Sequence, residues 1–357
     1  MSRRLILRIA FCVVWSVFAA ELFLRVMHPV PMLPRYVQST PYGIRGNMPE
    51  TEYWHSTPDY KIEVRTNEHG MRADNPIPFE KPENTKRIVM LGDSFGMGFG
   101  ATAEQTFLSQ LKQNLSEAGE TVDTLNLCVS GHGNAEQLIE LKNRGIKFDP
   151  DIVLVAWHHS DLDDNIRSGL FKLENDQLVR AHKSYLPGTK IAERLFRNRA
   201  YRWLAGNCQL YTWSREKASS VAQQAMLNLR PTKAVRKSLQ HAKKGQEESK
   251  RGSNYPDRLS LALLTEMKRV TEEHGAKFVI VIVPRRYNRV LFATDFPIEV
   301  AEASPELDIV NPLPRFEKHS GELIYWEQSH FHFTPLGNRI VGQAIAEHIL
   351  EHDLLGQ

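Results

Sequence analysis

Four short polar segments carry residue types that nucleophilic catalysis uses. Ser94 stands in Gly92-Asp-Ser-Phe-Gly96 directly after an apolar run, and Gly131 and Ser160 follow two further apolar runs. His332 lies much later in the chain. A serine within reach of an imidazole can attack a carbonyl carbon, because the histidine accepts the hydroxyl proton. A serine in such a turn can also be purely structural, so the prediction depends on whether these segments meet in the fold.

The elements that must bring these segments together form a regular alternation of strands and helices. This spacing predicts a three-layer α/β/α sandwich around a mostly parallel, flavodoxin-like sheet of about five strands. Ligands bind beyond the carboxyl ends of such strands, where Ser94, Gly131 and Ser160 are expected to converge. The expected strands are 88–91, 123–129, 152–157, 278–283 and 307–310, and the expected helices are 102–118, 135–144, 257–274 and 335–350.

The first residues of the chain have the pattern of a membrane-targeting segment. Three arginines at positions 3, 4 and 8 precede an apolar stretch that continues to Val26. This pattern predicts a signal anchor in residues 1–27, with a cleaved signal peptide and a buried core helix as the alternatives. The anchor would hold the body in the periplasm or outside the cell, and cleavage would release it as a secreted protein.

Composition limits the class of protein. The chain has 357 residues, of which 41% are hydrophobic and 24% charged, as in ordinary globular proteins. Three cysteines are too few for a disulfide scaffold and have no zinc spacing. The expected organisation is an N-terminal extension over 28–84 and a domain over 85–350, interrupted by a basic helical insert at about 166–256.

The insert region differs in charge from the rest of the chain. Residues 166–260 hold 20 Lys and Arg against 7 Asp and Glu, although the whole chain has a net charge of only +3. One interpretation is a helical lid or a surface that rests on anionic lipid or polymer. The other is a solvated helical decoration with its own small core. Nucleic acid is not expected as a partner of an exported protein.

Four segments together resemble the SGNH/GDSL hydrolase family, in particular its bacterial branch with a single N-terminal membrane anchor. The resemblance covers roughly residues 60–165 and 257–350, with the blocks in the family's order. The matching segments are Gly92-Asp93-Ser94, Asn126-Leu-Cys-Val-Ser-Gly131, Ser160-Asp161 and His332-Phe-Thr-Pro-Leu-Gly337.

The resemblance implies a role for each matching residue. Ser94 would be the nucleophile and His332 the general base. The backbone N–H groups of Ser94 and Gly131 would form most of an oxyanion hole. Ser160 stands where the family has an asparagine whose amide is the third donor, and its shorter hydroxyl would have to replace that amide. Asn165 is an alternative donor.

The family's usual aspartate before the histidine is missing. Ser329 and His330 occupy its place, and Glu327 lies near. The orienting group could therefore be Glu327, a carboxylate from another segment, or a backbone carbonyl in a dyad. Glu327-Gln-Ser-His330 also offers His330 as an alternative base, but the His-x-Thr-x-x-Gly context favours His332.

The resemblance implies an exported serine esterase that hydrolyses or transfers an acyl or acetyl ester. A plausible carrier of that ester is an extracellular polysaccharide or an envelope glycan. The alternative is a noncatalytic protein of the same fold that binds glycan or lipid. No cofactor is implied. No metal site is predicted, because the histidine pairs at 158–159 and 330–332 lack metal-ligand spacing.

Overall fold

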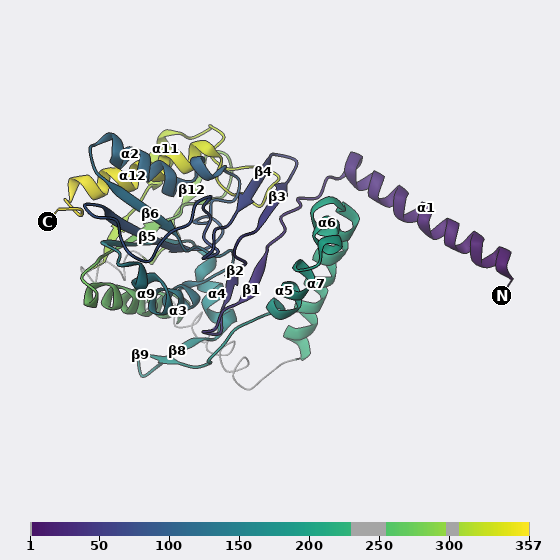
Figure 1. Ribbon diagram of the computed structural model, residues 1–357, viewed down its shortest axis with the longest axis horizontal. Coiled ribbons are helices and arrows are strands. Elements are labelled where there is room, and N and C mark those ends of the chain that lie inside the picture. The colour runs from purple at the N-terminus through teal and green to yellow at the C-terminus, as the bar shows by residue number, and fades with distance from the viewer. Residues whose placement is uncertain (1, 230–254, 298–306, 357) are drawn as a thin grey trace.

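The computed structural model describes residues 2–229, 255–297 and 307–356. Its centre is a sheet of five parallel strands in the order β6-β5-β7-β10-β13 (Figure 1). If these five strands are numbered along the chain, their order across the sheet is 2-1-3-4-5, which is the flavodoxin-like order. The predicted fold class is confirmed. The strands are β5 (Lys86–Gly92), β6 (Val122–Asn126), β7 (Ile152–Trp157), β10 (Lys277–Ile282) and β13 (Asp308–Val310).

Helices cover both faces of this sheet. Ile88 and Met90 of β5 share a core with α2 and α12, whereas Val89 and Leu91 share another with α3 and α9. A strand buried on both faces has a continuous apolar sequence, which is why β5 was predictable. The helices around the sheet are α2 (Phe107–Glu117), α3 (Asn134–Asn143), α4 (Ser160–Ser168), α9 (Tyr255–Glu273), α11 (Leu313–Lys318) and α12 (Pro335–Glu351).

The helix expected from Thr102 is interrupted, and that prediction was wrong in this detail. A 3-10 turn, Ala103–Gln105, comes first, and Thr106 then adopts an extended conformation and caps α2 by accepting from the Ser109 N–H. A side-chain cap replaces one of the hydrogen bonds that a helix start lacks. A second 3-10 turn, Gly145–Phe148, follows α3.

The N-terminal extension forms two hairpins, β1 with β2 and β3 with β4. It packs against the carboxyl end of the sheet: the Asn47 side-chain amide donates to the Cys128 carbonyl at 3.1 Å, and the His55 ring lies 4.4 Å from that of Phe99. The extension therefore reaches the edge at which a site is expected. Its strands are β1 (Val37–Ser39), β2 (Arg45–Asn47), β3 (Glu52–Ser56) and β4 (Lys61–Arg65).

The basic insert is helical over most of its described part, but a hairpin precedes the helices. Helix α5 contacts β1 and α6 contacts β3, so the insert packs on the extension (Figure 1). Residues 230–254 of the predicted insert lie outside the described residues. Its elements are β8 (Phe171–Glu174), β9 (Gln177–Arg180), α5 (Thr189–Phe196), α6 (Arg199–Asn207) and α7 (Gln209–Leu229); a further short pair is β11 (Arg285–Arg286) with β12 (Phe292–Ala293).

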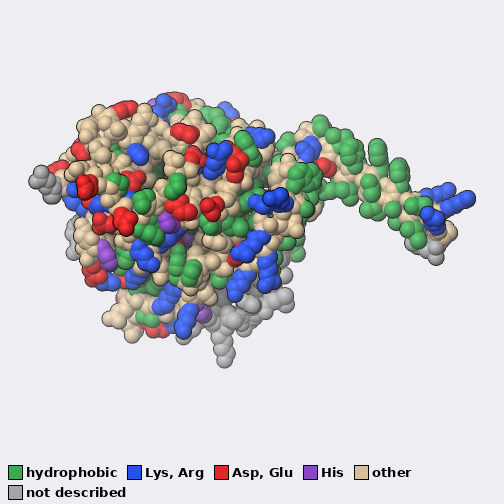
Figure 2. Space-filling view, in the orientation of Figure 1, with side chains coloured by type: hydrophobic (Ala, Val, Ile, Leu, Met, Phe, Trp, Pro, Cys, Tyr) green, Lys and Arg blue, Asp and Glu red, His purple; other side chains and the backbone are tan. Residues whose placement is uncertain are grey.

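Helix α1 (Arg3–Met27) projects away from the body, and Figure 2 shows its surface covered with hydrophobic side chains and basic at the tip. It is long and apolar enough to cross a membrane, and a signal sequence would meet the same criteria. Its Glu21 carboxylate accepts from the N–H groups of Gln209 and Leu210, at 3.1 and 2.7 Å, and so joins α1 to the start of α7.

Candidate active site

Ser94 lies two residues beyond the end of β5, in a tight turn that exposes part of its side chain. The Asp93 carboxylate accepts from the Phe95 N–H at 2.8 Å and holds this turn. Gly96 is required here, because a Cβ on it would stand 2.5 Å from the Cys128 sulfur. The turn therefore presents the serine hydroxyl at the carboxyl edge of the sheet, next to the strand-order reversal between β5 and β7.

His332 reaches this hydroxyl from the segment before α12. Its Nε2 lies 2.9 Å from Ser94 Oγ. The preceding His330 and Phe331 both have left-handed backbones, with φ of 57° and 53°, which is uncommon for residues other than glycine. This tight turn brings His332 inward, where it is only 6% exposed, and leaves His330 exposed.

The protonation state of His332 suits a general base. Burial lowers the pKa of His332 to about 4; the Ser329 carbonyl opposes this effect, and the charges of His330 and Arg35 add to it. The ring is therefore neutral at neutral pH. Its Nδ1 lies 3.2 Å from the Ser329 carbonyl oxygen, which can only accept, so Nδ1 carries the proton. The lone pair of Nε2 then faces the Ser94 hydroxyl.

The Ser329 carbonyl is itself held by the N-terminal extension. Asp59 Oδ2 accepts from the Gln328 N–H and from the Ser329 hydroxyl, each at 2.7 Å. Asp59 thus holds residues 328–329, and the carbonyl of Ser329 in this segment contacts His332. Sequence reasoning missed this residue, since nothing in the extension links it to a histidine more than 270 positions later.

Glu327 does not contact His332. Its carboxylate pairs with Arg289 at 2.6 and 2.9 Å and with Arg286 at 3.4 Å. The hydrogen bond from Arg289 lowers the pKa of Glu327, which stays charged and engaged there. Of the three orienting groups considered, the geometry brings a backbone carbonyl to His332.

Two backbone donors remain free near the serine. Within the described residues, no hydrogen bond uses the N–H group of Ser94 or that of Gly131. Gly131 lies five residues beyond Asn126, the last residue of β6, and has a left-handed backbone with φ of 76°. Unpaired N–H groups beside a nucleophile are what an oxyanion hole needs.

The third donor position is different. The Ser160 hydroxyl lies 2.8 Å from His158 Nδ1 and donates to Asp93 at 3.4 Å, so its neighbours already use it. Asn165 is fully buried and fixes the start of α3: its oxygen accepts from the Ala135 N–H and its amide donates to Asn134. The structure thus places Ser160 near the site and gives Asn165 a purely internal role.

Burial also acts on the carboxyl group of Asp93, the residue before Ser94. It raises the pKa of Asp93 to about 7, against the lowering effect of the Phe95 N–H. Burial lowers the pKa of the adjacent His158 well below its usual value. Across residues 2–229, 255–297 and 307–356, no group of three or more His, Cys, Asp or Glu side chains is placed to hold a metal ion.

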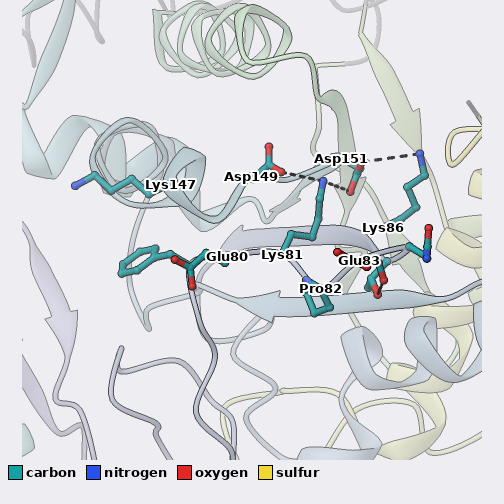
Figure 3. Close-up of a pocket in the computed structure, with 11 residues that line it drawn as sticks. Glu80, Lys81, Pro82, Glu83, Lys86, Lys147, Asp149 and Asp151 are labelled. Atoms are coloured by element: carbon teal, nitrogen blue, oxygen red, sulfur yellow. Dashed lines mark hydrogen bonds and ion pairs between the residues drawn. The ribbon is translucent and has the colours of Figure 1, made fainter.

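A hollow lies at the opposite edge of the sheet, where the strands begin (Figure 3). It measures about 930 Å³ and is lined by the segment from Phe79 to Lys86 together with Lys147, Asp149 and Asp151. Lys81 bridges the carboxylates of Asp149 and Asp151 at 3.2 and 2.9 Å. Lys86 adds a second cation 4.0 Å from Asp151, and none of the described residues that line this hollow is a serine, cysteine or histidine.

Comparison with known proteins adds likeness to solved structures. No protein-family model and no curated protein matches the sequence. A G-D-S-L family lipolytic protein from Desulfitobacterium hafniense is 9% identical, covering 74% of this chain and 99% of that one, with a TM-score of 0.39. A lipase/acylhydrolase from Enterococcus faecalis is 13% identical (75% and 96% covered, TM-score 0.39), and a Clostridium thermocellum family 3 carbohydrate esterase is 10% identical (75% and 96%, TM-score 0.37).

These structures are of the class that the four sequence blocks resemble. With TM-scores below 0.5, their likeness by itself decides neither fold nor activity. The order of the five parallel strands defines the fold of this chain, and the contact between Ser94 and His332 defines the chemistry available to it.

Proposed function

We propose that this chain is a serine ester hydrolase of the SGNH type, with Ser94 as nucleophile and His332 as general base. The observation that carries the proposal is the 2.9 Å contact between Ser94 Oγ and the Nε2 atom of a neutral His332. Both side chains lie at the edge of the sheet where ligands bind in this fold.

The reaction would proceed through an acyl-enzyme. His332 Nε2 takes the hydroxyl proton as Ser94 Oγ attacks the ester carbonyl, and the free N–H groups of Ser94 and Gly131 bind the oxyanion. The imidazolium then gives the proton to the departing alcohol. Water then attacks the acyl-enzyme in the same way, with His332 as base, which releases the acid and restores Ser94. A sugar hydroxyl in place of that water would make the same residues an acyltransferase.

Positioning in this scheme depends on Asp59. The carboxylate holds residues 328–329, and the Ser329 carbonyl fixes the Nδ1–H tautomer of His332. A group that fixes the tautomer performs the main task of a triad acid without a direct contact.

We further propose that α1 is a signal anchor and that the substrate is an acyl or acetyl ester on an extracellular polysaccharide or envelope glycan. Arg3, Arg4 and Arg8 favour retention of the N-terminus in the cytoplasm, which would leave the body outside. Intact mass of the chain isolated from membranes tests this: the full-length mass is expected, and a mass lacking residues 1–27 would mean cleavage.

Fluorophosphonate labelling of the full chain in detergent tests the catalytic proposal. One adduct on Ser94 is expected, absent from Ser94→Ala and strongly reduced in His332→Ala, with His330→Ala labelled like the wild type. Circular dichroism of each variant checks folding. A folded wild-type protein that forms no adduct would contradict the proposal and favour a noncatalytic, glycan- or lipid-binding protein.

A further inference from the structure

An arginine without a partner stands beside the candidate site. Arg35 is exposed, and within the described residues it takes part in no hydrogen bond or ion pair. Its Nη1 lies 3.9 Å from the point where a Cβ on Gly131 would stand. Its charge also reaches the other half of the site, where it acts on His332. Arg35 therefore lies near the oxyanion-hole glycine, and its charge is felt by the base.

The backbone on either side of Arg35 is rigidly held. Pro34 accepts from His55 Nε2 at 3.1 Å, and Tyr36 accepts from the Met48 N–H at 2.8 Å. The buried Tyr36 ring also packs between the rings of Tyr53 and Phe196, at 4.4 and 4.5 Å. The arginine is thus presented from a fixed support made jointly by the extension and the insert.

Further positive charge and unused polar atoms surround the same turn. Arg45 Nη2 donates to the Ser130 carbonyl at 2.5 Å. Among the described residues, the buried Nε of Arg45 has no acceptor and the buried hydroxyl of Ser130 has no hydrogen-bond partner. Although part of the Arg35 side chain reaches solvent, desolvation by the surrounding atoms, with the charges of Arg45 and Arg215, lowers the pKa of Arg35 to about 10. A nearby anion would relieve this crowding of positive charge.

The carboxylate that acts most strongly on Arg35 is Asp93, which is already bonded to the Phe95 N–H and to Ser160. Arg35 thus has its bonding capacity free for a ligand. A guanidinium matches a carboxylate or a phosphate through two parallel hydrogen bonds. In a partly enclosed site such a pair is stronger than on an open surface.

We propose that Arg35 binds an anionic group on the substrate, so that the substrate class is an acyl ester of an acidic sugar. This inference rests on the proposed esterase function and names its substrate class. The anion is a carboxylate, as in a uronic acid, or a phosphate on the sugar. When the acyl group is acetyl, the charge must lie on the alcohol side of the ester, because acetyl carries none.

Acetate release from matched esters tests the inference on the full chain in detergent. The three probes are the acetyl esters of methyl galactoside, of methyl galacturonoside and of galactose phosphate. Wild type is expected to have a kcat/KM about tenfold to a hundredfold higher for at least one anionic ester than for the neutral one. In Arg35→Gln that ratio falls to within about twofold of one, and Arg35→Lys keeps part of it. The anionic ester that shows the effect identifies carboxylate or phosphate as the group bound.

Arg339→Gln is the matched control, because Arg339 is an exposed arginine on α12, outside the site. It is expected to keep the wild-type ratio. A wild-type ratio near one would overturn the inference. An equal fall on charged and neutral esters in Arg35→Gln would also overturn it, and would make Arg35 a group that stabilises the oxyanion.

Calorimetry with free galacturonate, galactose and inorganic phosphate separates this inference from the esterase proposal. Binding of galacturonate or phosphate that Arg35→Gln abolishes, in a chain that cleaves no ester, would uphold the anion site and contradict the esterase. Turnover of the neutral ester without binding of either anion would contradict the anion site alone.

Discussion

Charged side chains are paired differently at the two ends of the central strands, which are the amino edge, where the strands begin, and the carboxyl edge, where they end. At the amino edge, the fully buried Arg87 pairs with Asp123 at 3.1 Å and donates to the carbonyls of Phe79 and Phe148. At the carboxyl edge, Arg35 has no such partner among the described residues, and His332 is neutral with its lone pair on Ser94. One edge satisfies its polar groups internally, and the other leaves several unsatisfied.

The hollow at the amino edge does not coincide with the Ser94–His332 pair. The hollow of about 930 Å³ lies at the amino edge, where Lys81 and Lys86 offset the charges of Asp149 and Asp151 (Figure 3). Side chains that bind each other have little capacity left for a substrate. At the carboxyl edge, the free N–H groups of Ser94 and Gly131 keep that capacity. Unused hydrogen-bonding atoms around Ser94, and not the volume of a hollow, therefore support the proposed site.

The largest effect is expected from the base at the carboxyl edge. His332→Ala should lower kcat/KM for an acetyl ester by about 10⁴-fold, because the serine then has no proton acceptor. Turnover of nitrophenyl acetate by the purified full chain measures it. His330→Ala is the control and should stay within about threefold of the wild type, since His330 is exposed. The reverse result would make His330 the base and break the assignment.

The next largest effect is expected at the amino edge, on stability. Arg87→Met removes a buried cation and leaves Asp123 and the carbonyls of Phe79, Glu80 and Phe148 without their donor, so it should lower the free energy of unfolding by about 3–5 kcal/mol. Urea denaturation measures this loss. The kcat/KM per folded molecule should not change. A stable variant that has lost activity would show that the two edges are coupled.

Asp59 comes third, as a residue that acts through the Ser329 backbone. Asp59→Ala should lower kcat about ten- to a hundredfold with little change in KM, because the carbonyl that orients His332 loses its support. The Ser329 carbonyl raises the pKa of His332, so loosening it should also move the acid limb of the pH profile to lower pH. Asp74→Ala, an exposed carboxylate of the same extension, is the control. An unmoved acid limb would reduce Asp59 to a structural residue.

A pH profile of the wild type gives a fourth, smaller effect. The base works only when neutral, and burial lowers the pKa of His332 to about 4, so kcat/KM should fall only as the pH drops through about 4. An unperturbed histidine would be only about one tenth neutral at pH 5.5, and activity there would be tenfold lower. Rates from pH 3.5 to 8 measure the limb. A midpoint near 6.5 would mean that the site is more hydrated than the structure has it.

The sheet was predictable because a strand that is buried on both faces, such as β5, has a continuous apolar sequence. The extension was less predictable, since its hairpins are short, and strands such as β1 are only partly buried. Thr106 shows a second limit: a cap inside an apparently continuous helix pattern splits it, and the pattern alone does not reveal this.

The residues of the proposed site also differ in how far the sequence predicts them. Ser94, Gly131 and His332 stand in short blocks with a fixed place relative to a strand or helix, so their convergence could be predicted. The choice among the three candidate orienting groups could not be made from the sequence, because the Ser329 carbonyl is backbone and leaves no trace in residue type. Arg35 and Asp59 come from the extension and reach the site only through tertiary packing, which no local spacing encodes.

The smallest effect is expected from Lys81 at the amino edge. Lys81→Met removes a cation shared by Asp149 and Asp151, but Asp151 keeps its bond to the Arg87 N–H at 2.6 Å. The free energy of unfolding should therefore fall by only about 0.5–1 kcal/mol, and kcat/KM should stay unchanged. Urea denaturation and ester turnover measure the two. Lys86→Met, whose ammonium lies 4.0 Å from Asp151, is the control with a still weaker pair. A change in kcat/KM for Lys81→Met would mean that the amino-edge hollow communicates with Ser94, and the contrast between the two edges would fail.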